Sequence, residues 1–171
     1  MTKTHKAAYP VDKDVLNSAA LAMAYRNNGT YFLPQAYPEG CPQHPSYAQG
    51  HASIAGACAT ILKAAFDGDV PFSALTSGGI VTASEEGLSL VPYTGSDASQ
   101  ITINGEINKL ASNIGLGRNF AGIHWRSDYT AGLILGEAVA ISILRDQRDA
   151  YAGEDFAGFT ITKFDGTTIA V

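Results

Sequence analysis

The stretch HASIAGACATILKAAF (51–66) decides the fold, because it is largely apolar, lacks proline and is rich in small side chains. Residues three or four apart in a helix lie on one face. At that spacing one face is predicted to carry Ala52, Ala55, Gly56, Ala59 and Lys63. Side chains this small allow two helix backbones to come close together. The stretch is therefore predicted to be a buried helix that packs tightly against another helix.

Two segments further along the chain are also predicted to be helices. Residues 127–148 have the longest helical pattern, and Arg145 and Arg148 lie near its C-terminal end, where the helix dipole favours cations. Residues 104–118, NGEINKLASNIGLGR, have a shorter one. Together with 51–66, these segments predict a mainly α-helical bundle.

Before the bundle, residues 12–27 are predicted to form an amphipathic helix that ends at Asn27-Asn28-Gly29. Its predicted apolar face consists of Val15, Leu16, Ala19, Ala22 and Met23. Residues 31–45 contain four prolines, and residues 77–100 show no apolar period. Both segments are therefore predicted to be irregular.

The last residues change from a helical period to alternation. FTITKF (159–164) and TTIAV (167–171) alternate in polarity, and Asp165-Gly166 between them is a type I′ turn pair. A β-hairpin is therefore predicted over 158–171. A chain of 171 residues is long enough for one hydrophobic core. We expect a single domain over 1–171, a helical bundle with a C-terminal β-hairpin.

The composition limits the possible partners. Only 16% of the residues are charged, against about a quarter in typical soluble domains, so the chain is expected to oligomerise or to be one piece of a larger body. A net charge of −5 gives no general attraction for nucleic acid or acidic membranes. The N-terminus lacks the apolar core of a signal peptide, and the longest apolar run, 129–144, is shorter than the roughly 20 residues that cross a bilayer. We expect a soluble, cytoplasmic protein.

Two stretches carry the residues suited to chemistry: CPQHPSYAQGH (41–51) and GRNFAGIHWRSD (117–128). Asp128 follows His124 by four residues and can accept a hydrogen bond from its ring, which leaves the other ring nitrogen available as nucleophile or ligand. His51 is expected at a helix N-terminus, where free N–H groups favour an anion. Gly50 allows close backbone approach, and Arg118 offers a planar fork for two oxygens. These groups predict a site for phosphate or vanadate.

The same stretches identify a resemblance. TYFLPQAYPEGCPQHPSYAQGHASIAGACATILKA (30–64), NGEINKL (104–110) and GRNFAGIHWRSDYTAGLILGE (117–137) resemble the C-terminal part of the vanadium-dependent haloperoxidases, especially the bromoperoxidase branch. The resemblance covers nearly all of the chain. More widely, the motifs resemble the type 2 phosphatidic acid phosphatases, which share the oxyanion pocket. The resemblance implies the helical bundle of these families.

The resemblance also implies roles for single residues. His124 would bond vanadium and would be the metal ligand, with Asp128 orienting its ring. Arg118 and the backbone N–H of Gly50 would hold oxygens of vanadate. His51 would be the acid–base residue, and His44 matches an extra pocket histidine of the bromoperoxidases. The implied cofactor is vanadate, for which phosphate could substitute, and the implied substrates are hydrogen peroxide and a halide such as bromide, oxidised to a hypohalous species that reacts with an organic acceptor.

The sequence departs from the family pattern at two places. Gln49 replaces a serine whose hydroxyl donates to vanadate, and its amide is expected to donate instead. An upstream family motif with a Lys and an Arg-Pro pair has no counterpart, since the chain contains no Arg-Pro. A complementing N-terminal chain could supply these cations, and homo-oligomers are also expected. Two alternatives to a haloperoxidase stay open: an acid phosphatase, and a non-catalytic oxyanion-binding remnant or assembly subunit.

Overall fold

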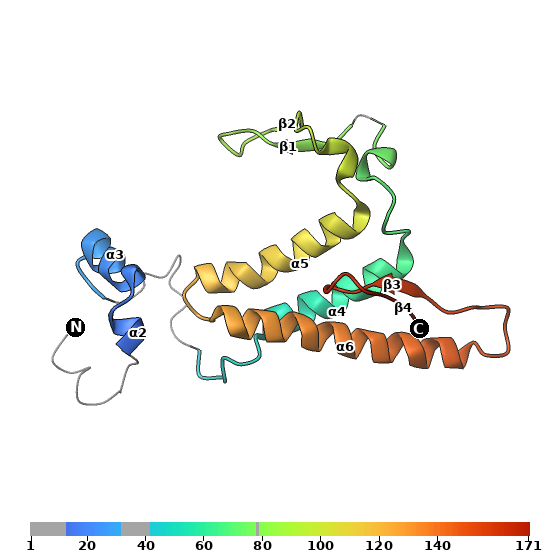
Figure 1. Ribbon diagram of the computed structural model, residues 1–171. Helices are drawn as coiled ribbons and strands as arrows, with labels where there is room; N and C mark the ends of the chain where they lie inside the picture. The colour runs from blue at the N-terminus through green and yellow to red at the C-terminus, as the bar shows by residue number, and fades with distance from the viewer. Residues whose placement is uncertain (1–12, 32–41, 78) are drawn as a thin grey trace.

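A bundle of three helices forms the body of the protein in the computed structural model, which describes residues 13–31, 42–77 and 79–171. The helices are α4 (Gly50–Ala65), α5 (Ile103–Phe120) and α6 (Arg126–Ala150). In Figure 1, α4 and α6 lie side by side along the base of the bundle, and α5 crosses above them. The mainly α-helical fold and these three predicted helices are confirmed.

The contact between α4 and α6 depends on residues without a Cβ. A Cβ on Gly136 of α6 would lie 2.0 Å from the backbone oxygen of Ser53, and one on Gly56 of α4 would lie 2.5 Å from the backbone oxygen of Leu133. All five residues that the sequence places on the inner face of α4 are buried: Ala52, Ala55, Gly56, Ala59 and Lys63. The predicted close helix contact is therefore present.

Helix α5 closes the core from the other side of α4. Ala111 of α5 and Leu133 of α6 join the alanines of α4 in one buried cluster, against which Ile107 and Tyr129 pack. This cluster is built mainly from small side chains, while many large ones elsewhere remain exposed. Exposed large apolar residues include Ile54, Leu110, Phe120, Ile134, Leu135, Val139 and Ile143.

The C-terminal hairpin packs on the bundle. Strands β3 (Thr160–Thr162) and β4 (Thr168–Ala170) are antiparallel, with Ile161 opposite Ile169. The predicted hairpin is confirmed, but the predicted type I′ turn is wrong. Within this turn only Gly166 has a positive φ, 83°. The Lys163 N–H donates to the backbone oxygen of Thr167 across a three-residue loop. A type I′ turn needs two positive φ values, and this geometry is a type I turn with a glycine bulge.

Two buried ionisable side chains contact Phe164 in the hairpin loop. Glu137 of α6 accepts a hydrogen bond of 2.6 Å from the backbone N–H of Phe164. Lys63 of α4 lies over the Phe164 ring, 4.1 Å from Nζ to the centroid. Burial lowers the pKa of Lys63, and the charge of Glu137 opposes that shift. The two contacts connect α4 and α6 to the hairpin.

The N-terminal part differs from its prediction. Instead of one helix over 12–27 there are two, α2 (Lys13–Leu16) and α3 (Ala19–Asn28), because Ser18 interrupts the first and caps the second by accepting from the Leu21 N–H. Gly29, with φ of 68°, ends α3 as predicted. No residue of either helix is buried, so the predicted apolar face has no core to cover. Most of the predicted irregular segment 31–45 lies outside the described residues.

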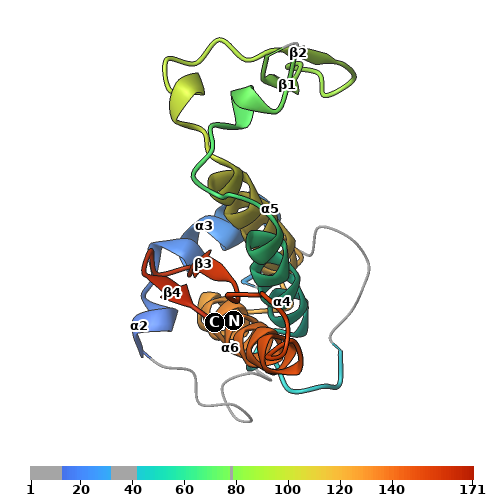
Figure 2. The same ribbon diagram turned by 90° about the vertical axis from the view of Figure 1, so that its right-hand side faces the viewer.

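Residues 67–102 leave the bundle and return to it. They contain two 3-10 turns, η1 (Phe72–Ala74) and η2 (Ala98–Gln100), and an antiparallel pair, β1 (Val81–Ala83) and β2 (Leu90–Pro92). The prediction of an irregular 77–100 is therefore wrong for these strands. Figures 1 and 2 show the pair projecting away from the helices. Where the excursion rejoins the bundle, the Phe72 N–H bonds to the Ile101 oxygen at 2.7 Å.

Helix α6 meets the length and composition of a membrane-crossing helix, the single case among the described residues. Core helices of water-soluble proteins meet the same criteria. Here α6 packs along α4, and the carboxylates of Asp128 and Glu137 are buried.

Candidate oxyanion-binding site

The turn between α5 and α6 holds two of the predicted site residues. The N–H groups of Ala121, Gly122 and Ile123 bond back to the carbonyls of Gly117, Asn119 and Arg118 at 3.0, 3.0 and 3.2 Å. Gly122 takes φ of 78°, which permits this tight reversal. The half-buried Arg118 and the buried His124 therefore lie at the two ends of one rigid turn.

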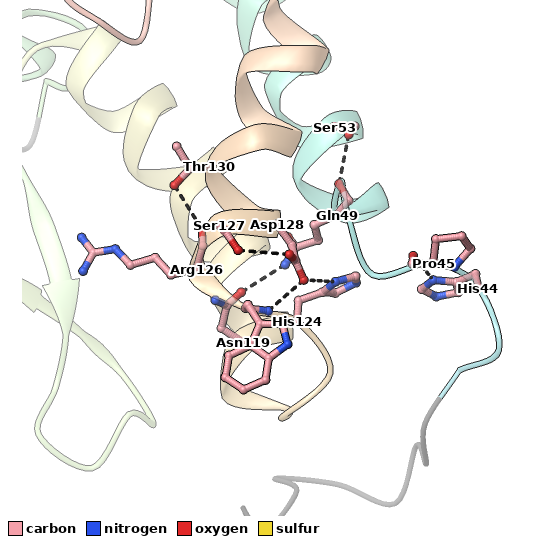
Figure 3. A network of polar contacts seen from close by, with 11 residues as sticks. His44, Pro45, Gln49, Ser53, Asn119, His124, Arg126, Ser127, Asp128 and Thr130 are labelled. Carbon is pink, nitrogen blue, oxygen red and sulfur yellow. Dashed lines mark hydrogen bonds and ion pairs between the residues drawn. The ribbon is translucent and has the colours of Figure 1, made fainter. Parts of the chain in front are cut away.

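Asp128 connects His124 to the first turn of α6. Its Oδ2 accepts a 3.0 Å hydrogen bond from the backbone N–H of Trp125, and Nδ1 of His124 lies 3.4 Å from the same oxygen. The second distance is long for an N–H···O bond. Ser127 Oγ donates to Oδ1 at 3.2 Å. Figure 3 shows these groups converging on the carboxylate. The predicted pairing of His124 with Asp128 is present, and it directs Nε2 away from the carboxylate.

The charge of Asp128 is stabilised in spite of its burial. Burial alone would raise the pKa of this carboxyl group. The hydrogen bonds from the Trp125 backbone and from the side chains of His124, Ser46 and Ser127 outweigh that effect and hold the pKa of Asp128 below its ordinary value. The carboxylate is therefore ionised at neutral pH and favours a proton on Nδ1 of His124.

His44 lies beside the His124 ring, on the side away from Asp128. The two ring centroids are 5.9 Å apart and the planes differ by 23°, so the imidazoles stack. His44 is exposed, and its Nδ1 lies 2.9 Å from the oxygen of Pro45. The predicted extra histidine is therefore next to His124 (Figure 3).

The start of α4 meets α6 at the same end of the bundle. The backbone N–H of Gln49 donates to the oxygen of Asp128 at 3.0 Å. Gly50 and His51 follow as the first two residues of α4, as predicted, and both are exposed. As the first residue of the helix, Gly50 has an N–H without an intrahelical acceptor. A Cβ on Gly50 would have no heavy atom within 4 Å, so the space beside it is open.

Gln49 differs from the other predicted site residues because it is wholly buried, with 0% of its surface exposed. Its Nε2 donates to Oδ1 of Asn119 at 3.1 Å. Asn119, Ser46 and Ser127 are polar residues of the site that the sequence did not single out. Each contacts its partner through a single side-chain bond, and no motif spacing marks such a contact.

The donor set suits a multiply charged oxyanion. An imidazole nitrogen, a guanidinium group and a helix N-terminal amide together offer one ligand for a central atom and several donors for its oxygens. Within 13–31, 42–77 and 79–171, no group of three or more His, Cys, Asp or Glu residues could hold a metal ion. A metal oxyanion such as vanadate would be held here through the nitrogen of His124. The residues present fit vanadate, as they fit phosphate.

The chain also matches known proteins along most of its length. Residues 20–153 match the family model described as the VCPO second helical-bundle domain. The chain is 42% identical over 167 residues to a vanadium-dependent bromoperoxidase of Corallina officinalis, and 43% identical over 166 residues to that of Corallina pilulifera. These alignments cover 93% and 92% of this chain but 26% of each relative.

A third relative extends the comparison to another genus. The vanadium-dependent bromoperoxidase of Ascophyllum nodosum is 42% identical over 153 residues, which cover 82% of this chain and 26% of the relative. The chain thus spans about a quarter of the length of the curated relatives it matches. From its helical bundle, its family-model match and these identities, the chain belongs to the vanadium haloperoxidases, as the second helical-bundle domain of their C-terminal part.

Proposed function

We propose that this chain forms the vanadate-binding part of a haloperoxidase that oxidises bromide with hydrogen peroxide to a hypohalous species. The observation that carries the proposal is the buried Asp128–His124 pair next to the start of α4, in a chain 42% identical to a vanadium-dependent bromoperoxidase. The ionised carboxylate orients the ring and leaves Nε2 of His124 as the ligand nitrogen.

Each nearby residue has a distinct proposed role. Vanadate, when bound, supplies a Lewis acid that activates hydrogen peroxide. Arg118 and the Gly50 N–H would hold its oxygens, which fixes their orientation and offsets their charge. The exposed imidazole of His51 would take a proton from the incoming peroxide. The stacked ring of His44 would extend the pocket next to His124.

The site needs further positive charge, which we propose comes from another polypeptide segment. Arg118 is the one guanidinium assigned to the oxyanion, and a multiply charged anion requires more compensation. The chain spans about a quarter of its relatives. Apolar side chains near the site, such as Phe120 at 83% exposure, offer a surface for that segment. A complementing N-terminal segment would carry the missing Lys and Arg, and a homo-oligomer would cover the remaining apolar surface.

Titration of the purified chain with orthovanadate in a calorimeter, beside His124→Ala, tests the proposal. We expect binding by the parent chain, and a loss of at least tenfold in His124→Ala, because a metal-ligand bond is removed. Asn113→Ala, an exposed change on α5, is the control and should bind as the parent does. Equal binding by the parent and His124→Ala would overturn the assignment of His124.

Activity assays separate the haloperoxidase from the phosphatase alternative, since both would bind phosphate. Phosphate is expected to compete with vanadate for the same donors. Hydrolysis of a phosphomonoester by the vanadium-free chain, lost in His124→Ala, would favour the phosphatase. Bromination that needs both vanadate and peroxide, measured after adding the complementing segment, would favour the haloperoxidase.

A further inference from the structure

Gln49 lies where the three bundle helices meet. It is the N-cap of α4, and its side chain reaches α5 through the 3.1 Å bond from Nε2 to Asn119 Oδ1. Its backbone N–H donates a 3.0 Å hydrogen bond to the backbone oxygen of Asp128 on α6. Its own carbonyl accepts from the N–H and the hydroxyl of Ser53, both at 3.0 Å, inside α4. One residue therefore joins all three helices at the site end of the bundle.

The surroundings are shaped to hold a side chain of this size. Gly115 of α5 faces Gln49: a Cβ there would lie 3.3 Å from Gln49 Oε1 and 2.4 Å from Cδ2 of Tyr129. The carboxamide and the Tyr129 ring fill the space that Gly115 leaves. Oε1 of Gln49 is buried and has no hydrogen-bond partner among the described residues.

These contacts do not suit a direct donor to an oxyanion. Gln49 is wholly enclosed by protein, one N–H of its amide bonds to Asn119, and its unpartnered atom is an acceptor, which would repel anionic oxygens. The contacts suit a brace. The segment that contains Gln49 holds Asp128 at two points, through the Gln49 N–H and through the Ser46 hydroxyl on its carboxylate.

We propose that Gln49 is a positioning residue that acts through Asn119 and Asp128. It fixes the start of α4, with Gly50 and His51, relative to the α5–α6 turn that carries Arg118 and His124. Such a brace matters because donors misplaced by about 1 Å lose much of their effect on a bound oxyanion. The expected effect on anion binding rests on the proposed function. The expected effect on Asp128 and His124 rests only on the contacts within the bundle.

The test changes the lengths of the Gln49 and Asn119 side chains, which are hydrogen-bonded to each other. Gln49→Asn shortens one side of the bridge by a methylene, Asn119→Gln lengthens the other, and the double variant restores the total length. Asn113→Gln makes the same chemical change as Asn119→Gln at an exposed site on α5 and is the control. Nitrogen-detected NMR of the His124 ring in anion-free protein, and calorimetry with orthovanadate, are the two measurements.

We expect each single variant to reduce the fraction of His124 rings protonated on Nδ1, because the Asp128 carboxylate is held less firmly. Orthovanadate affinity should fall about fivefold, the loss expected for one hydrogen bond. The double variant should recover both signals, and Asn113→Gln should change neither. Thermal unfolding of each variant checks that the bundle is intact.

Two results would overturn the brace. The first is a double variant as weak as the two single changes combined, which would mean that Gln49 and Asn119 do not act together as a bridge. The second is a His124 spectrum that no single variant alters. If the parent chain binds no orthovanadate even with the complementing segment added, the proposed function fails, yet recovery of the Nδ1–H signal in the double variant would still support the brace.

Discussion

Both carboxylate oxygens of Asp128 are hydrogen-bonded, and the partners come from two parts of the chain. Ser127 bonds to one oxygen and the Trp125 N–H to the other, while the Ser46 hydroxyl approaches from the segment before α4. A side chain of 3% exposure that carries a charge needs such partners, because an unpaired charge in that place would be costly. The hydrogen bonds give Asp128 a structural role beside its proposed function.

The lowered pKa of Asp128 makes stability depend on pH. Since the pKa is lower in the folded than in the unfolded chain, the stabilisation is complete above the unfolded value of about 4 and is lost as the pH falls through the folded value. Asp128→Asn should cost about 1–3 kcal/mol at pH 7. The difference from the parent should shrink below about pH 4. Urea unfolding between pH 7 and pH 3 measures it.

A matched change on the same helix is the control for that titration. Asp146 is exposed on α6. The Asp146→Asn chain should therefore have nearly the same free energy of unfolding as the parent at both ends of the pH range. A constant gap between Asp128→Asn and the parent at every pH would contradict the argument from the pKa.

At the scale of elements, the α4–α6 contact sets the position of the site. The start of α4 is adjacent to the first turn of α6 because Gly56, Gly132 and Gly136 let the two backbones approach. A Cβ on Gly132 would lie 2.6 Å from the oxygen of Gln49, so the close contact extends to the site itself. Any residue that separated the helices would also move the start of α4, with His51, away from the first turn of α6.

Gly136→Ala tests this contact. Its Cβ would lie 2.0 Å from the oxygen of Ser53, so the helices must shift, and we expect a loss of about 1–3 kcal/mol in the free energy of unfolding. Gly117→Ala is the control, since a Cβ there meets nothing within 4 Å and alanine favours the helix by about 0.5–1 kcal/mol. Chemical denaturation of both variants gives the comparison. A Gly136→Ala chain as stable as the parent would contradict the close packing.

The elements that could be predicted from the sequence are those with one buried face. The buried residues of α4, from Ala52 to Lys63, recur every three or four positions because one face of the helix packs inside the bundle. Their spacing in the sequence therefore predicts that contact. The strands β1 and β2 are exposed along their whole length, and nothing selects alternation in them. The apolar residues of 12–27 mimic a buried face, but the Ser18 cap, a local bond, divides the helix.

The site could be predicted only where local spacing carries it. Asp128 follows His124 by four residues, which places both at one turn and makes their contact predictable. The bond from Gln49 to Asn119 joins residues 70 positions apart. Neither residue type marks such a contact, because asparagine and glutamine also occur at exposed positions. Packing, rather than spacing, decides which carboxamides meet.

At the scale of the whole molecule, the low charge content goes with large apolar side chains on the surface. Large apolar side chains are exposed on every bundle helix, such as Ile54 of α4, Leu110 of α5 and Ile134 of α6, at 68%, 56% and 57% exposure. Exposed large apolar side chains on each helix make contact with another protein surface favourable. The exposed residues agree with a chain that spans a quarter of its relatives.

We expect the isolated chain to self-associate through this surface. Its weight-average mass in sedimentation equilibrium should rise with concentration, and Ile134→Lys combined with Ile143→Lys should weaken the association at least tenfold, because two charges would be desolvated. Gln147→Lys, at an exposed polar position of α6, is the control for added charge. A parent chain that stays monomeric across the range would show that the apolar surface is tolerated in water.

The excursion over 67–102 enters and leaves the bundle at one point. Pro71 and Thr102 form a β-bridge, so the two ends of the segment are fastened together before α5 begins. Thr102 then caps α5 by accepting from the Gly105 N–H at 3.1 Å. A segment whose ends are closed by the scaffold can change in length without altering the scaffold. Evolution, or a protein engineer, could exchange the projecting hairpin as a cassette while the helices beneath it keep their register.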